Sequence, residues 1–338
     1  MNNRRWLIAA NPLGRALQAS DFRFDEGEAP APGPGAFLVR VSMLSFDPAL
    51  KSYMENIAGY AAATEIGGVM LGEGAGEVVA SNHPEFPVGA RVKGAFGWQE
   101  YAVSNGAGVA RIAEAVRDEA ALGVLGVTGK TAYCGLVEAG RPKPGDVLVV
   151  SGAAGATGSI VGQIGKIAGC RVIGIAGGGE KCKRLVDEFG FDAAIDYKNE
   201  KARKRLRELA PGGVDVFFDN VGGEILNDVL ARLAHGARVV ICGAISRYNF
   251  DPRDPAQMPE GPRNYFNLVH AHATMQGFIL HHYERFHQIA EARLSSWLEQ
   301  GRLKPAVDVL DGLEAAPQAL MRLFTGGNFG KQLVRIRA

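Results

Sequence analysis

From about residue 145 onward, apolar segments alternate with helix-forming segments, and this order constrains the fold more than any other feature. Five strands are predicted, with the sequences DVLVVSG, CRVIGIAG, AAID, VDVFFDN and ARVVICG. Four helices are predicted between them, at 158–169, 180–189, 199–209 and 224–234. ATMQGFIL, near 273–280, predicts a sixth strand, and a long amphipathic helix is predicted at 283–300. Strands that are apolar throughout and alternate with helices indicate a parallel sheet covered on both faces.

Residues 1–124 follow a different pattern. Brief β-type segments are separated there by Gly, Pro and Asn, and they read AFLVRVSMLSFD, GEVVASNH, GARVKGAF and QEYAVS. The tail GNFGKQLVRIRA ends in another such segment. The sequence therefore predicts an α/β protein with a mostly β module before the parallel sheet.

Composition excludes several classes of protein. The 338 residues carry a formal net charge of +1, so nothing indicates a nucleic acid or an acidic surface as partner. No apolar run approaches the roughly 18 residues that span a membrane. The four cysteines form no Cys-x-x-Cys pair and no cluster with histidine, which argues against a disulfide scaffold and favours a cytoplasmic location.

The glycine-rich turn SGAAGATGS lies between the first predicted strand and its helix. Gly152, Gly155 and Gly158 recur every third residue, and Ala153, Ala154 and Ala156 are small enough to let a phosphate approach. Free amides at the start of the helix bind a pyrophosphate well. A turn that only tightens strand–helix packing is the alternative, but the alternating pattern downstream favours nucleotide binding.

The end of the second strand selects the cofactor. An NAD site usually places Asp or Glu there, where it binds the adenosine ribose. The strand instead runs into GIAGGGEKCK, with no carboxylate at its tip. Lys181 would attract a 2′-phosphate, whereas Lys183 is interpreted as a solvated helix residue. We therefore predict NADPH over NADH.

Two later turns also contain residues that could contact a bound cofactor. Asn220 follows the fourth strand, and Gly243 and Ala244 follow the fifth. Ligands of open parallel sheets lie beyond the carboxyl ends of the strands, so these residues are expected near the cofactor. A helix cap or a plain turn is the alternative for both.

Several segments in the right order resemble the zinc-independent medium-chain dehydrogenases/reductases, in the group of prostaglandin reductase and bacterial curcumin reductase. The segments are AAGATGSIVGQIGKIAGC, EKCKRLVDEFGFDAAIDYK, DVFFDNVGGEILN, VVICGAISRYN and GNFGKQLV. The resemblance implies a GroES-like β-barrel domain at 1–124, completed by 296–338. It also implies a Rossmann NADP-binding domain at 125–295.

The resemblance also implies roles for individual residues. Ala153, Ala154, Gly155 and Ala156 would hold the pyrophosphate, and Lys181 and Tyr197 would flank the 2′-phosphate. Other cofactor contacts would come from Asn220, Cys242, Gly243, Ala244, Ile245, Ser246, Tyr248, Phe278, Ile279, Leu280 and Asn328.

No catalytic zinc is expected. Zinc-dependent relatives carry a Gly-His-Glu signature, and Gly72 stands where that histidine would be. The position of their catalytic cysteine falls within LSFDPAL, which has none, and residues 1–124 contain one histidine, His83. A catalytic zinc site needs three protein ligands.

Without zinc, hydride addition to a polarised acceptor is the easier chemistry. We expect reduction of the C=C bond of an α,β-unsaturated ketone or aldehyde, with hydrogen bonds to the developing enolate oxygen. Tyr248 and Tyr60 are the candidate donors. Asp47 is interpreted first as a helix cap of ALKSYM and second as a substrate contact. Lys51 stands where the resembling family often has arginine.

Two alternatives remain open. One is an NADPH:quinone oxidoreductase, and the other is a nucleotide-binding module without turnover. A small-molecule substrate and a homodimer are expected as partners.

Overall fold

The computed structural model describes residues 1–56 and 64–336. The chain forms two compact units. Unit 1 comprises Met1–Gly123, Tyr248–Asp251 and Val307–Ala338. Unit 2 comprises Val124–Arg247 and Pro252–Ala306. The four residues Tyr248–Asp251 thus belong to unit 1, while the chain on either side of them belongs to unit 2.

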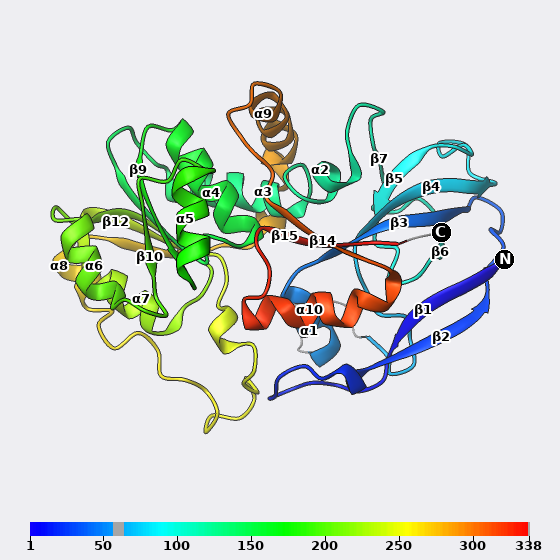
Figure 1. The fold of residues 1–338 in the computed structure, drawn as a ribbon, viewed down its shortest axis with the longest axis horizontal. Helices are drawn as coiled ribbons and strands as arrows, with labels where there is room; N and C mark the ends of the chain where they lie inside the picture. The colour runs from blue at the N-terminus through cyan, green and yellow to red at the C-terminus, as the bar shows by residue number, and fades with distance from the viewer. Residues whose placement is uncertain (57–63, 337–338) are drawn as a thin grey trace. The chain divides into compact units, whose positions relative to one another are not determined.

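Unit 2 is built on a six-stranded parallel sheet (Figure 1). In chain order its strands are β8 (Val147–Ser151), β9 (Arg171–Ala176), β10 (Ala193–Asp196), β11 (Val214–Asp219), β12 (Leu233–Ile241) and β13 (Thr274–Gly277). Their order in space is β10-β9-β8-β11-β12-β13, the doubly wound 3-2-1-4-5-6 arrangement. All six predicted strands are confirmed.

Helices follow the strands of unit 2 as predicted. They are α4 (Ala156–Ile167), α5 (Gly179–Asp187), α6 (Ala202–Leu209) and α7 (Gly223–Leu230), with α3 (Val127–Tyr133), the π-helical turn η2 (Cys134–Gly140) and α8 (Asn267–His270) outside that series. The amphipathic segment at 283–300 is not one helix. It divides into η4 (Leu280–Phe286) and α9 (His287–Glu299). Tyr283 departs from helical geometry, with its ring 4.9 Å from that of Phe278 and its hydroxyl accepting a hydrogen bond from Gln276.

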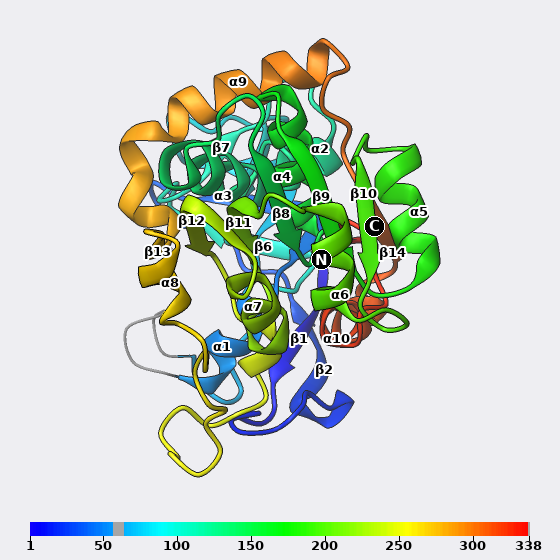
Figure 2. The ribbon, with the colours of Figure 1, turned by 90° about the vertical axis from the view of Figure 1, so that its left-hand side faces the viewer.

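Both faces of this sheet are covered. On one face α6 and α7 pack their apolar residues, including Leu206 and Val229, against Val149 and Phe217 of the sheet. On the other face glycines let α4 approach closely. A Cβ at Gly165 would lie 2.4 Å from Leu148 Cδ2, so the helix backbone itself packs on β8. Strand β13, beside β12 in Figure 2, is an edge strand whose four residues are exposed.

Unit 1 is mostly β-structure, as predicted for residues 1–124. Its long strand β3 (Phe37–Phe46) pairs with three others. The remaining strands are β1 (Asn2–Ile8), β2 (Phe22–Glu28), β4 (Gly74–Ser81), β5 (Arg91–Gly94), β6 (Tyr101–Ser104), β7 (Ala110–Arg111), β14 (Val307–Asp311) and β15 (Lys331–Arg335). Strand β2 was not predicted, because FRFDEGE is rich in charge, although it pairs with β1 over its full length.

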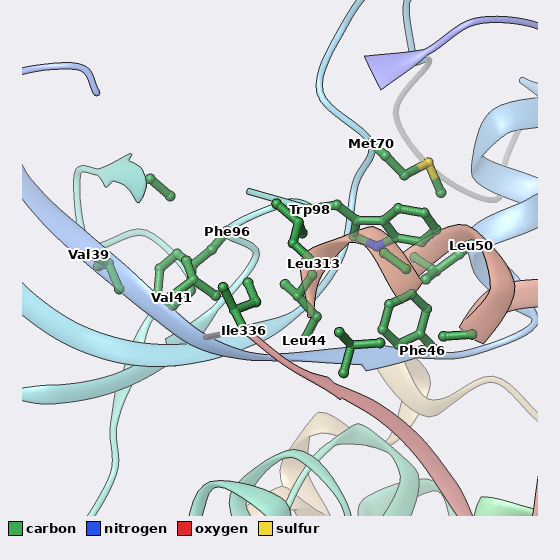
Figure 3. Packing of buried hydrophobic residues seen from close by; sticks show 14 of the residues in the cluster. Val39, Val41, Leu44, Phe46, Leu50, Met70, Phe96, Trp98, Leu313 and Ile336 are labelled. Carbon is green, nitrogen blue, oxygen red and sulfur yellow. The ribbon is translucent and has the colours of Figure 1, made fainter. Parts of the chain in front are cut away.

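Short helices complete unit 1: α1 (Ala49–Glu55), α2 (Asp118–Leu122) and α10 (Ala316–Thr325), with the 3-10 turns η1 (Ala19–Asp21) and η5 (Leu313–Ala315). The core gathers around the fully buried Trp98, whose ring lies beside Met70, Leu50 and Phe46 (Figure 3). None of the helices in the described ranges is long and apolar enough to cross a membrane. Another short 3-10 turn, η3 (Ile245–Arg247), belongs to unit 2.

Candidate functional site

The carboxyl ends of β8 and β11 form the topological switch point of the sheet. These neighbouring strands belong to different halves of the doubly wound arrangement, and ligands of such sheets bind at this edge. Gly152 follows β8 with a φ of 58°, a left-handed conformation that favours glycine. A Cβ there would lie 3.4 Å from Cβ of Asn220, so the two predicted turns lie side by side.

A buried hydrogen-bond network joins the two strand ends. Ser151 Oγ donates to Asp219 Oδ1 over 2.6 Å and accepts from the amide of Asn220 over 2.8 Å. The side-chain amide of Asn220 donates to the carbonyl of Ser151, also over 2.8 Å. Asp219 also accepts from the amides of Val221 and Gly222. The network therefore fixes Asn220 on the turn after β8.

Burial dominates the electrostatics of Asp219. The side chain is fully buried, and this raises the pKa of the carboxyl, although hydrogen bonds from Ser151 and two amides oppose the effect. Burial, followed by the nearby Asp219, also raises the pKa of the Cys242 thiol to about 12. The thiol is therefore protonated at neutral pH, and a thiolate role for Cys242 is excluded.

Some residues of the glycine-rich turn pack inside unit 2, and others form the partly exposed start of α4. A Cβ at Gly158 would lie 2.4 Å from the carbonyl oxygen of Gly152, so only glycine fits. Ala153 and Ala154 are buried, and the amide of Ala153 donates to the carbonyl of Ile175. Ala156 is half-buried in the first turn of α4, where the leading amides have no partner within the helix. This turn can hold an anion.

Two side chains from the turn after β10 lie over Gly177, the residue that follows β9. A Cβ at Gly177 would lie 2.9 Å from Tyr197 Oη and 3.0 Å from Lys198 Cε. Lys181 is half-buried in the first turn of α5. Sequence reasoning named Lys181 and Tyr197 but missed Lys198. The signal was present, because Lys198 follows Tyr197 directly in the same turn after β10.

The segment from Cys242 to Ser246 is tied to the turn after β11. The amides of Cys242 and Gly243 both donate to the carbonyl of Asp219, and that of Ile245 donates to Asn220. Ser246 Oγ donates to the carbonyl of Val221 over 2.6 Å. The structure thus brings most of the predicted unit 2 residues to one edge of the sheet. These are Gly155, Ala156, Asn220, Cys242, Gly243, Ala244, Ile245 and Ser246.

Phe278, Ile279 and Leu280 follow β13. The ring of Phe278 is buried near Gly135, in the packing of unit 2. Ile279 is exposed and Leu280 half-buried. The side chain of Phe278 thus has a packing role, and its contact with the cofactor stays a prediction.

The remaining predicted residues belong to unit 1. Tyr248 is half-buried, with its ring centroid 6.0 Å from that of Phe324 in an edge-on arrangement. Asn328 is buried and its side-chain amide donates to the carbonyl of Gly330. Tyr60 lies outside the described residues.

Asp47 is not a helix cap, so that interpretation was wrong. Helix α1 begins without a side-chain capping bond, and the carboxylate of Asp47 pairs with Lys331 Nζ over 2.6 Å. Lys331 is almost fully buried, and a buried ammonium needs an ionic partner more than a helix end needs a cap.

The chain was compared with known proteins. Residues 4–112 match a family model described as the N-terminal domain of oxidoreductase. Residues 156–296 match a model described as zinc-binding dehydrogenase.

Relatives match over almost the whole chain. NADPH-dependent curcumin reductase of Escherichia coli is 37% identical over 99% of this chain and 97% of that protein. The NADP-dependent 2-alkenal reductase of Nicotiana tabacum is 36% identical, over 90% of this chain and 88% of that protein.

Solved structures have the same fold. CurA from Vibrio vulnificus, in complex with NADPH, is 40% identical with a TM-score of 0.92, over 99% of both chains. A quinone oxidoreductase of Pseudomonas syringae is 25% identical with a TM-score of 0.77, over 99% of this chain and all of that one.

The chain belongs to the medium-chain dehydrogenase/reductase family. Within that family its relatives include the curcumin and prostaglandin reductases, as the sequence segments predicted. The α/β fold prediction is confirmed as well, and membership makes the protein an oxidoreductase.

The residues of unit 1 do not fit the zinc that the second family description implies. A Cβ at Gly72 would lie 2.8 Å from the indole of Trp98, so no histidine side chain fits at that position. Across residues 1–56 and 64–336, no group of three or more His, Cys, Asp and Glu could hold a metal ion. We therefore derive no step through zinc.

The raised pKa of Asp219 predicts a pH effect on stability. The stability that this carboxyl contributes is fully present below its unfolded pKa, near 3.8, and is lost as the pH rises through the folded value. Asp219→Asn removes this titration. The difference between the free energies of unfolding of the variant and of the unmodified protein should therefore become more favourable to the variant as the pH rises. Urea denaturation from about pH 4 to about pH 8 measures this difference.

Asp192→Asn is the matched control with the opposite sign. Burial of Asp192 is outweighed by hydrogen bonds from Lys166 and the amide of Val172, which lower the pKa of its carboxyl. Its contribution to stability is lost as the pH falls below about 4. With the urea series extended to about pH 2, the variant should be less stable than the unmodified protein at neutral pH, and this difference should shrink in acid. The same direction of change in both variants would contradict the account.

Proposed function

We propose that this protein reduces the C=C bond of α,β-unsaturated aldehydes and ketones with NADPH. The observation that carries the proposal is identity above 35% with NADP-dependent reductases, along nearly the full chain. A 2-alkenal is by definition an α,β-unsaturated aldehyde. The protein is an NADP-dependent oxidoreductase, and NADP(H) is its cofactor.

The edge of the unit 2 sheet fits a dinucleotide. In the proposal, the first turn of α4, which begins at Ala156, holds the pyrophosphate, because its leading amides are not used within the helix. Gly155 stays a predicted contact, although its amide already donates to the carbonyl of Gly152. Asn220 and the segment from Cys242 to Ser246 then line the nicotinamide end. Their backbone is fixed by the network around Ser151 and Asp219 before any ligand binds.

The end of β9 supplies the 2′-phosphate site. Tyr197 and Lys198 lie over Gly177, and Lys181 lies in the first turn of α5, which begins two residues later. Two ammonium groups in this region favour the phosphate of NADPH. The nearby Asp196 does not act as a ribose carboxylate in this scheme. It already accepts hydrogen bonds from the amides of Gly178 and Lys198 and from Asn199.

The residues supply orientation and hydrogen bonds rather than a nucleophile. When bound, NADPH supplies a hydride, which the β-carbon of the unsaturated substrate accepts. The negative charge that develops on the substrate oxygen needs a donor, and the phenol O–H of Tyr248 can donate a hydrogen bond to it. We assign this role to Tyr248, and Tyr60 stays a prediction for a second donor. Protonation at the α-carbon completes the reaction.

Quinone reduction is the second candidate. The quinone oxidoreductase named above is 25% identical, which is well below the identity to the 2-alkenal and curcumin reductases. The homodimer and the cytoplasmic location stay predictions.

Incubation with a panel of enals, enones and quinones tests the proposal. With NADPH, the protein should convert an enal or enone to a product two hydrogens heavier by mass spectrometry, and NMR should show that this product keeps its carbonyl group. Hydroquinone as the only product would favour the second candidate. NADPH binding without turnover of any acceptor would favour a non-enzymatic nucleotide-binding module.

Lys198→Ala tests the 2′-phosphate site. Loss of one charge-assisted hydrogen bond should raise KM for NADPH about tenfold, as should Lys181→Ala, with little change in KM for NADH. Lys183→Ala is the control, because that exposed lysine lies on the same helix as Lys181 and should change neither constant. Equal effects of Lys198→Ala on both cofactors would contradict the assignment.

A further inference from the structure

A buried ion pair lies on helix α1 and contacts the segment that carries Tyr248. Lys51 and Glu55 are four residues apart on that helix, with side chains 0% and 3% exposed, and their charged groups are hydrogen-bonded. The Lys51 ammonium also donates to the backbone carbonyl of Tyr248 over 2.5 Å. It therefore joins a helix near residue 50 to a segment almost 200 positions away in sequence.

Stability alone does not explain this pair. Removing two charges from water is costly, and a pair of apolar residues of similar size often stabilises a fold equally well. Burial raises the pKa of the Glu55 carboxyl, the nearby Asp251 adds to this, and the hydrogen bond and charge of Lys51 act in the opposite direction. An ammonium is useful here because it donates to two acceptors at once, and the second is the Tyr248 carbonyl.

The segment that Lys51 contacts is short, and it belongs to a different unit from the chain on either side of it. Only Tyr248–Asp251 packs with unit 1, between stretches that pack with unit 2. Its residues form a turn and a bend rather than a helix or strand. Two of the contacts of Tyr248 lie in unit 1: its carbonyl accepts a hydrogen bond from Lys51, and its ring lies edge-on to Phe324 of α10.

We propose that Lys51 is a positioning residue, which fixes the main chain of Tyr248 and thereby aims its phenol. The inference rests on the proposed function, because it takes Tyr248 to be the donor to the enolate. Glu55 supports it by compensating the buried charge. Misplacement of a catalytic donor by about 1 Å can reduce turnover about 100-fold, so a fixed main chain at this point has a large effect.

The test uses a variant that removes both charges, because Lys51→Met alone leaves Glu55 buried without its partner. Lys51→Met with Glu55→Met keeps the buried volume and loses only the bond to Tyr248 and the ion pair. We expect a folded protein with an unchanged Kd for NADPH. Its kcat for an enone should fall about 10- to 100-fold, with a smaller change in KM.

A double-mutant cycle with Tyr248→Phe separates positioning from a general structural effect. If Lys51 acts through the phenol, adding the two methionines to Tyr248→Phe should change kcat less than about twofold. Independent, multiplicative losses would overturn the inference. An unchanged kcat in Tyr248→Phe would also overturn it, because Lys51 would then position a residue that takes no part in catalysis.

Amide hydrogen exchange gives a readout that needs no turnover. Peptides covering residues 245–254 should exchange about tenfold faster in the double methionine variant, in line with the loss of one charge-assisted hydrogen bond. Unchanged exchange would overturn the inference even if the protein reduces no enone. Failure of the proposed function is thus detected separately, by absence of turnover in the unmodified protein.

The matched control removes another ion pair of unit 1. Arg5 and Asp25 are 2.7 Å apart on the paired strands β1 and β2, and both are partly exposed. Arg5→Met with Asp25→Asn should leave kcat and the exchange of 245–254 unchanged. An effect as large as that of the Lys51 variant would assign the loss to general destabilisation and overturn the inference.

Discussion

The hydrogen bond between Ser151 and Asp219 is the interaction on which the candidate site depends. It joins the carboxyl ends of β8 and β11, where the two halves of the doubly wound sheet meet. Through it the turn after β8, the side chain of Asn220 and the segment from Cys242 become one fixed unit. Because the carboxyl is buried, hydrogen bonds from the Ser151 hydroxyl and from the amides of Val221 and Gly222 replace solvation there.

The fold of unit 2 was predictable because its signals are local. Apolar strands and glycine turns repeat in order, and each predicted strand and helix between residues 145 and 241 is present. The strand β2 was missed because its outward-facing residues are charged. The prediction of one long helix at 283–300 was wrong at its start. Hydrophobic periodicity cannot show that Tyr283 departs from helical geometry and packs against Phe278.

The site was predictable only in part. The spacing of small residues indicates a phosphate-binding turn, but it does not show that Ala153 already donates its amide to Ile175. Long-range pairs carry no local signal either. Asp47 pairs with Lys331 and Lys51 contacts Tyr248, over separations of 284 and 197 residues of sequence. Such contacts form only in the complete fold. A pattern within one segment can identify one residue of the pair but cannot predict its partner.

The fate of the transferred hydride tests the proposed chemistry most directly. NADPH carrying deuterium at the reactive nicotinamide carbon should give an enone product with deuterium on the β-carbon and a solvent hydrogen on the α-carbon, by NMR. Deuterium on the carbon of a newly formed alcohol would contradict the account, because the carbonyl rather than the double bond would then be reduced.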